Sequence, residues 1–346
     1  MVVTIPPRLV VLAPNWLGDA VMALPLLNDI RRAWPESHLA VAARPGVAPL
    51  YEMVSGVAEI LRFEGNGGSA VRHWRRDARL LQHGRFDAAL LLPNSFLAAW
   101  LAARAGIPER WGYARDLRGR LLTRPIPRPR DALHQADYYQ RLATALGLSI
   151  SEGFAHVDIA DRAHARAREL LGEAGLAPAQ RYVVCAPGAA YGRAKQWLPE
   201  RFAELAGLLD RDGLATVLVG TEADRAVCAS IVRRAQGGAT IVDLSGRTDL
   251  ATLAAVMSGA DATIANDSGA MHLASAAGSR VVAIFGPTDH RKTAPLRVNA
   301  TASPPVIVAT RVWCRPCMLR ECPIDHRCMR RISARDVFAS VSRAQQ

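Results

Sequence analysis

The chain has 346 residues, of which 50% are hydrophobic, and carries a formal net charge of +12. This length and apolar content suffice for two domains with separate cores, which argues against a disordered chain. The charge favours a polyanionic partner, namely nucleic acid, an acidic membrane surface or a phosphorylated glycolipid, although arginine-rich composition alone explains part of it. No apolar run reaches the roughly 18 residues of a membrane span, and the start lacks signal-peptide features. We expect a cytoplasmic protein that contacts a membrane only peripherally.

Apolar runs of strand length alternate with amphipathic helical stretches, which is typical of parallel sheets covered by helices. The expected strands are 8–14, 38–44, 87–93, 182–188, 215–221, 240–246, 262–267 and 281–287. The expected helices are 19–33, 198–210, 222–235, 250–258 and 268–277. A polar segment, 149–181, lies between the two groups as a linker region. We therefore predict an α/β fold of two doubly wound, Rossmann-like domains, with a ligand cleft at the carboxyl ends of their strands.

The turn after the first expected strand, PNWLGDA, carries Asp19 where a dinucleotide-binding turn would carry the glycines of GxGxxG. Because a carboxylate repels phosphate, we do not expect the nucleotide in the first half. Asp19 at the start of a helix is stabilised by the helix dipole and would face the cleft. On spacing alone, a simple helix cap is the better interpretation.

The second half offers an anion site where strand 262–267 leads into the next helix. Free backbone N–H groups at Ser268 and Gly269, with His272 close by, suit a diphosphate. Asp267 is placed to accept hydrogen bonds from sugar hydroxyls. The alternatives are a helix cap at Asp267 and a packed histidine at position 272.

Two further charged residues follow expected strands. Lys195, in the loop PGAAYGRAKQW (187–197), could neutralise charge on a departing diphosphate without a metal, or be an ordinary surface lysine. Glu222 directly follows strand 215–221, where acids often bind ribose hydroxyls. This second signal is weak by itself.

The C-terminal part contains four cysteines with the spacing C-x2-C-x4-C-x5-C, namely Cys314, Cys317, Cys322 and Cys328. Four thiolates at this spacing suit a structural zinc or iron ion. Disulfides or free thiols are the alternatives, with disulfides disfavoured in a reducing cytoplasm. A separate arginine- and proline-rich segment, 115–130, is expected to form an exposed basic loop.

Several motifs occur together and in order: the Gly-Asp pair after the first strand, LLPNSF (91–96), PGAAYGRAKQW (187–197), NDSGAMH (266–272) and FGPTD (285–289). From about residue 9 to about residue 297 the chain resembles glycosyltransferase family 9, the lipopolysaccharide heptosyltransferases. The resemblance implies a glycosyltransferase-B fold with an acceptor domain at 1–165 and a nucleotide-sugar domain at 166–332. It also implies that a C-terminal helix, 333–346, packs back on the first domain.

The resemblance further implies an inverting transfer that needs no catalytic cofactor. A heptose would move from ADP-L-glycero-D-manno-heptose to the phosphorylated lipopolysaccharide inner core, onto the first heptose. Asp19 then resembles the general base, and Lys195 the residue that stabilises departing ADP. Asp267 and the helix start from Ser268 and Gly269 to His272 would hold the heptose and diphosphate, and Glu222 the ribose. Basic residues of the first half would bind the anionic acceptor: Arg115, Arg118 and Arg120, with Arg44 and Arg124 as further candidates.

Other functions compete with this one. The first alternative is a family 9 transferase with another donor or acceptor, such as heptosyltransferase I, a later core transferase or a protein heptosyltransferase. A nucleic-acid-binding protein would interleave aromatic residues with basic ones, yet segment 115–130 contains no aromatic residue. A sugar-nucleotide epimerase on the same fold would need a second acid or base opposite Asp19. Because segment 115–130 lacks aromatic residues, we expect no nucleic-acid partner.

Overall fold

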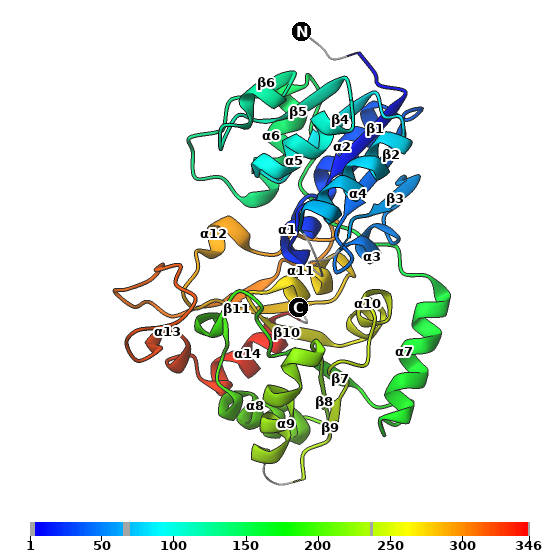
Figure 1. Ribbon diagram of the computed structural model, residues 1–346. Helices are drawn as coiled ribbons and strands as arrows, with labels where there is room; N and C mark the ends of the chain where they lie inside the picture. The colour runs from blue at the N-terminus through cyan, green and yellow to red at the C-terminus, as the bar shows by residue number, and fades with distance from the viewer. Residues whose placement is uncertain (1–3, 65–69, 236–237, 345–346) are drawn as a thin grey trace. The chain divides into compact units, whose positions relative to one another are not determined.

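The computed structural model describes residues 4–64, 70–235 and 238–344. The chain divides into two compact units, 1–153 and 154–346 (Figure 1). This boundary lies earlier than the predicted one at 165/166. The backbone explains the difference, because Ala155 N–H bonds Arg297 C=O at 3.1 Å and Val157 N–H bonds Ala276 C=O at 3.1 Å. Residues 154–157 are thus already attached to the second unit.

The first unit contains one parallel six-stranded sheet. Its strands are β1 (Arg8–Leu12), β2 (His38–Ala43), β3 (Glu59–Arg62), β4 (Ala88–Leu91), β5 (Glu109–Tyr113) and β6 (Arg124–Ile126). Their order in the sheet is β3-β2-β1-β4-β5-β6. The register pairs Val10 with both Ala40 and Ala89, so β1 lies in the centre. This is the strand order of a doubly wound fold.

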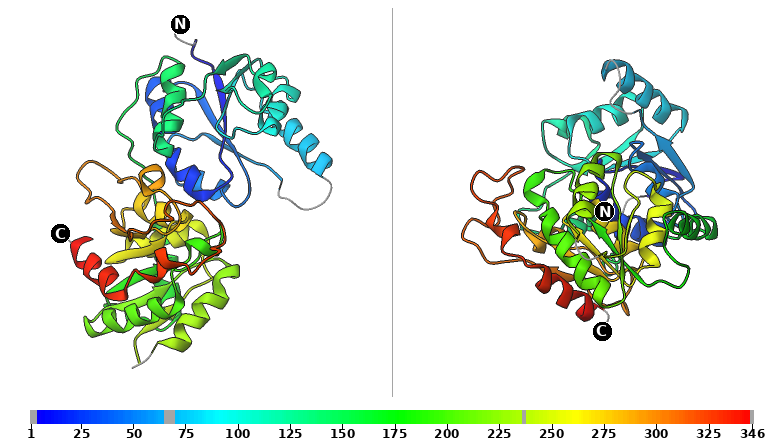
Figure 2. Two further views of the ribbon diagram at one scale, coloured as in Figure 1. Left: turned by 90° about the vertical axis from the view of Figure 1, so that its left-hand side faces the viewer. Right: turned by 90° about the horizontal axis from the view of Figure 1, so that it is seen from below.

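Helices cover both faces of this sheet (Figure 2). They are α1 (Leu17–Met22), α2 (Leu24–Ala33), α3 (Ala48–Tyr51), α4 (Ala70–His83), α5 (Phe96–Arg104) and α6 (Gln135–Ala145), with a 3-10 turn η1 (Arg118–Leu121). On one face, Leu81 of α4 and Leu101 of α5 pack with Val10 and Leu12 of β1 in one hydrophobic cluster. Elsewhere in the unit α2 packs against α6. The buried apolar runs of the strands therefore fix the centre of the unit.

The second unit repeats this plan. Its strands are β7 (Tyr182–Ala186), β8 (Ala215–Leu218), β9 (Ile241–Asp243), β10 (Ala262–Asn266), β11 (Val281–Ile284) and β12 (Val306–Val308). All pairs are parallel, in the order β12-β11-β10-β7-β8-β9. Counted from the first strand of the unit, this order is the same as in the first unit. The predicted α/β class with two doubly wound sheets is therefore confirmed.

The helices of the second unit are α7 (Asp161–Glu173), α8 (Pro199–Arg211), α9 (Arg225–Arg234), α10 (Leu250–Ser258), α11 (Gly269–Ala276), α12 (His290–Thr293), α13 (Arg327–Arg330) and α14 (Ala334–Ala344), with 3-10 turns η2 (Arg193–Lys195) and η3 (Glu222–Asp224). The final helix, α14, packs on α8, β11 and β12 of its own unit. That it also packs on the first domain stays a prediction. Its Val337 and Val341 are buried with Phe202 of α8 in the core of the second unit. These apolar side chains hold α14 to its own unit.

Several elements differ from the prediction, and helices α3 to α6 of the first unit were not predicted. The helix expected over 19–33 is divided at Ala23 into α1 and α2, because the ring of Pro25 is incompatible with a continuous helix. Four short strands, β3, β5, β6 and β12, were missed, since none has a long apolar run and three of them lie at sheet edges. Among the residues that the structure describes, no helix combines the length and apolar character needed to cross a bilayer.

Candidate active site

Three of the predicted site residues, Asp19, Lys195 and Asp267, lie at the switch point of a sheet. A switch point lies between two adjacent strands whose following connections leave in opposite directions. Ligands of doubly wound sheets bind there, outside the carboxyl ends of the strands. In the first unit it lies between β1 and β4, and in the second between β7 and β10. Asp19 follows β1, whereas Lys195 follows β7 and Asp267 follows β10. Sequence order alone thus places all three at ligand-binding edges.

Asp19 lines a cavity of about 200 Å³ in the first unit. Trp16 borders it from the same turn, Pro93 and Asn94 from the end of β4, and Tyr138 and Tyr139 from α6. The N-cap residue of α1 is Trp16, and Asp19 lies within the first turn. The interpretation of Asp19 as the helix cap is therefore wrong. Its charge is still favoured by the helix N-terminus.

The two tyrosines of α6 give this cavity hydroxyl groups beside the carboxylate. Burial, and next the charge of Asp19, raise the pKa of Tyr139 well above its ordinary value. Tyr139 is therefore protonated at neutral pH. The Tyr138 hydroxyl accepts a hydrogen bond from Asn94 Nδ2 at 2.8 Å. Tyr138 and Tyr139 were not predicted, because α6 carries no sequence motif and only the sheet topology brings it to this edge. Asn94 lies in the motif LLPNSF but was given no role.

Arg118 does not lie on an exposed loop. Its side chain is fully buried and donates to the carbonyl oxygens of Tyr113, at 2.8 Å, and Pro93, and to Asn94 Oδ1 at 3.3 Å. The prediction that Arg118 lies on an exposed loop is therefore wrong, whereas its role in acceptor binding stays a prediction. Its guanidinium instead fixes the segment after β4 that borders the Asp19 cavity.

The rest of the predicted basic loop is only partly irregular. It contains η1 and strand β6, while Arg115 and Arg120 are exposed, as predicted. Arg115 Nε lies 3.2 Å from Asp116 Oδ1. These two arginines keep their guanidinium groups in contact with solvent, where an anionic ligand could reach them.

In the second unit, Lys195 and Asp267 form an ion pair, with Nζ 2.6 Å from Oδ2. The side chains are only 14% and 4% exposed, so Lys195 is not an ordinary surface lysine. The Thr288 hydroxyl donates to the same Asp267 oxygen at 2.6 Å. The Lys195 ammonium also lies 4.7 Å from the centre of the Tyr191 ring, a cation–π contact. The cluster places the Lys195 ammonium, paired with the Asp267 carboxylate, at the strand ends.

The helix start predicted as the diphosphate site is formed by α11. Its N-cap is Ser268, so Asp267 is not the cap. Among the described residues, the Ser268 hydroxyl is buried without a hydrogen-bond partner. A ligand oxygen could supply this partner, since buried polar groups are normally satisfied. Gly269 is the first residue of the helix, and His272 is 3% exposed within it.

Glu222 begins η3 after β8, the strand next to β7. Its side chain is 73% exposed and lies 3.0 Å from Arg225 Nε. The acid is thus at a strand end on the same edge as Lys195, available to a ligand. The neighbouring Gly220 allows close packing of this turn, because a Cβ there would lie 2.7 Å from Asp224 Cβ.

The four-cysteine segment does not form the predicted metal site. Among the residues that the structure describes, no group of three or more His, Cys, Asp or Glu side chains is arranged to hold a metal ion. The thiols occupy different environments, with Cys317 exposed, Cys314 and Cys322 partly exposed, and Cys328 buried; all four are free. The zinc or iron prediction is therefore not supported, and neither is a disulfide.

Known structures show the class of this fold. ADP-heptose lps heptosyltransferase II of E. coli is 24% identical, with a TM-score of 0.82 over 98% of both chains. A family 9 glycosyl transferase from Veillonella parvula is 25% identical, with a TM-score of 0.79 over 87% of this chain and 85% of its own. The protein therefore has the glycosyltransferase-B fold.

Sequence comparison shows the family within this class. The lipopolysaccharide heptosyltransferase 2 of Salmonella typhimurium is 29% identical over 85% of this chain and 86% of its own. Residues 74–327 match the model of glycosyltransferase family 9 (heptosyltransferase). The chain belongs to this family and is a glycosyltransferase.

Proposed function

We propose that the protein transfers a heptose from ADP-heptose to the inner core of lipopolysaccharide, onto the first heptose, with inversion at the anomeric carbon. The name of the Salmonella relative and that of the E. coli structure support this donor and acceptor class. The observation that carries the proposal is the buried Lys195–Asp267 pair beside the free Ser268 hydroxyl, at the edge where such sheets bind nucleotides.

The second unit supplies the donor groups. The diphosphate lies at the start of α11, where backbone N–H groups favour an anion. The Lys195 ammonium neutralises the charge that grows on ADP as the bond to the anomeric carbon breaks. Asp267 orients Lys195 and accepts a hydrogen bond from the heptose. His272 lies within α11, the helix whose start holds the diphosphate. Glu222 binds the ribose hydroxyls.

The first unit supplies the base. As the acceptor oxygen forms its bond to the anomeric carbon, its proton passes to the Asp19 carboxylate, while the electron pair of the broken bond leaves with ADP. Arg115 and Arg120 bind phosphates of the inner core. Because this acceptor is anchored in a lipid, we also propose that the enzyme works at the cytoplasmic face of the inner membrane as a peripheral protein.

Transfer of labelled heptose from ADP-heptose to defined truncated cores tests the proposal. We expect a core that ends in the first heptose to be used and a core that lacks it to be refused. Asp19→Asn should lower kcat at least 100-fold, the lower range for a positioned acid or base, while ADP binding stays unchanged. Asp131→Asn, which removes an exposed acid of the same unit, is the matched control. Near-normal turnover of folded Asp19→Asn would exclude Asp19 as the base, and use of the shorter core would exclude the proposed acceptor.

A further inference from the structure

The segment that carries the four cysteines packs against the loop that carries Lys195. We call residues 311–329 the cysteine segment. Ala194, the residue before Lys195, is held at both of its backbone groups: its N–H donates to Arg320 C=O at 2.9 Å, and its carbonyl oxygen lies 2.7 Å from His326 Nε2. A carbonyl can only accept, so His326 Nε2 carries the hydrogen.

The same segment also holds the opposite side of the ion pair. Arg315 Nε donates to Gly286 C=O at 2.6 Å, and its Nη2 lies 3.3 Å from Thr288 C=O. Met318 N–H donates to Pro287 C=O at 3.0 Å. The loop 286–288 is therefore attached along its backbone, and the Thr288 side chain in turn bonds Asp267.

Tyr191 adds a third attachment to the same turn. Its hydroxyl donates to Met318 C=O at 2.8 Å. Its ring lies 4.7 Å from Lys195 Nζ and 5.2 Å from the guanidinium carbon of Arg320. At Gly192 a Cβ would overlap the Arg320 carbonyl oxygen, so only glycine permits this approach of the cysteine segment.

His326 is itself held in place by a cysteine. Its backbone N–H lies 3.3 Å from Cys322 Sγ, and its φ of +56° is in the left-handed region that few non-glycine residues adopt. These contacts fix the backbone from which the His326 imidazole reaches the Ala194 carbonyl oxygen. This is what the support of a preorganised site requires.

From these contacts we infer that His326 and Arg315 are positioning residues for Lys195 and Asp267, and that the cysteine segment supports the donor site. This inference rests on the proposed role of Lys195 at the donor diphosphate. The physical reason is that a displacement of about 1 Å at a reacting group can lower a rate by about 100-fold. Neither His326 nor Arg315 touches the substrate.

A double-mutant cycle in the full-length protein tests the inference. His326→Ala should weaken ADP binding and lower kcat about tenfold each, which corresponds to one lost hydrogen bond, while the acceptor KM stays constant. His326→Gln, whose amide can still donate, should restore most of both. In a Lys195→Ala background, His326→Ala should change ADP affinity less than twofold, because its effect passes through Lys195. Arg315→Ala should behave like His326→Ala.

Arg327→Ala is the matched control, since its guanidinium bonds Asp325 within the cysteine segment, and it should leave ADP affinity unchanged. Equal effects of His326→Ala with and without Lys195 would show a merely structural role and overturn the inference. Loss of activity in His326→Gln equal to that in His326→Ala would do the same. If wild-type protein bound no ADP, the proposed function would fail instead. Should His326→Ala not fold, His326→Gln and Arg315→Ala can be compared in the same way, by their ADP affinity with and without Lys195.

Discussion

Asn266 Oδ1 accepts a hydrogen bond from the backbone N–H of Trp197 at 3.0 Å, which joins the end of β10 to the segment after β7. The other end of the same amide donates to Pro187 C=O at 2.7 Å. Asn266 is fully buried. One side chain therefore closes the loop 187–197 on both sides of Lys195, at the switch point of the sheet.

We predict that Asn266→Ala lowers the free energy of unfolding by about 2–3 kcal/mol, because it leaves the Trp197 N–H and the Pro187 carbonyl buried without partners. Denaturant titration of the second unit's transition measures this loss. Asn266→Asp loses the donor and places a buried carboxylate against the Pro187 carbonyl oxygen, so it should be at least as destabilising as Asn266→Ala. If Asn266→Ala were as stable as wild type, water would have to satisfy both groups.

Arg118 and its exposed neighbours should respond oppositely to mutation. Arg118→Ala should destabilise the protein by about 2–4 kcal/mol, because the carbonyl oxygens of Tyr113 and Pro93 would lose their hydrogen-bond donor. Arg115→Ala and Arg120→Ala should change stability by about 0.5 kcal/mol or less and raise the acceptor KM. Thermal melts and acceptor titrations separate the two outcomes. A stable Arg118→Ala with a raised acceptor KM would instead support the prediction of an acceptor contact.

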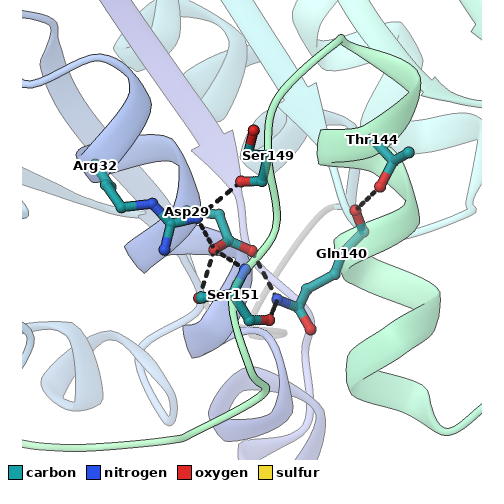
Figure 3. Close-up of polar contacts among 6 residues, drawn as sticks. All are labelled: Asp29, Arg32, Gln140, Thr144, Ser149 and Ser151. Atoms are coloured by element: carbon teal, nitrogen blue, oxygen red, sulfur yellow. Dashed lines mark hydrogen bonds and ion pairs between the residues drawn. The ribbon is translucent and has the colours of Figure 1, made fainter.

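Asp29 is buried and accepts hydrogen bonds from several elements of the first unit (Figure 3). Gln140 Nε2 donates at 2.6 Å, the Ser151 hydroxyl at 2.7 Å and the Ser151 N–H at 2.9 Å. Asp29→Ala should cost about 3–5 kcal/mol, since these donors would be left buried. Arg32→Ala should cost about 1 kcal/mol or less, because that side chain is 52% exposed. Melting temperatures of the two variants provide the test. Similar decreases for Asp29→Ala and Arg32→Ala would show that the buried hydrogen bonds of Asp29 add little stability.

The cysteines should differ in reactivity. Burial raises the pKa of Cys228 to about 12 and also raises that of Cys185. Because the thiolate is the reactive form, a raised pKa lowers the reactive fraction at pH 8, to roughly one in 10⁴ for Cys228. Exposed Cys317 should therefore be alkylated first by iodoacetamide, with Cys185 and Cys228 unmodified in the folded protein. Mass spectrometry of the peptides shows the order, and early labelling of Cys228 would contradict it.

The central strands could be predicted because each is a buried apolar run bounded by turn residues, as in VVAIFGP at β11. Edge strands such as β3 and β6 could not, since they bury few side chains and depend on pairing with strands distant in sequence. Asp19 and Lys195 were predicted because each lies in a motif that directly follows an expected strand, PNWLGDA and PGAAYGRAKQW. Tyr139 and His326 were missed because only tertiary packing brings them to the site. Arg118 was misplaced for the same reason, because its sequence context resembles that of its exposed neighbours.

The packing of α14 on α8, β11 and β12 has a consequence for engineering. The whole core of the second unit, including the last helix and the cysteine segment, is encoded without interruption after Gly153. Exchange of this unit between family members therefore needs a single crossover in the gene, placed between codons 153 and 154. A second crossover near codon 333 would separate α14 from the side chains that it covers.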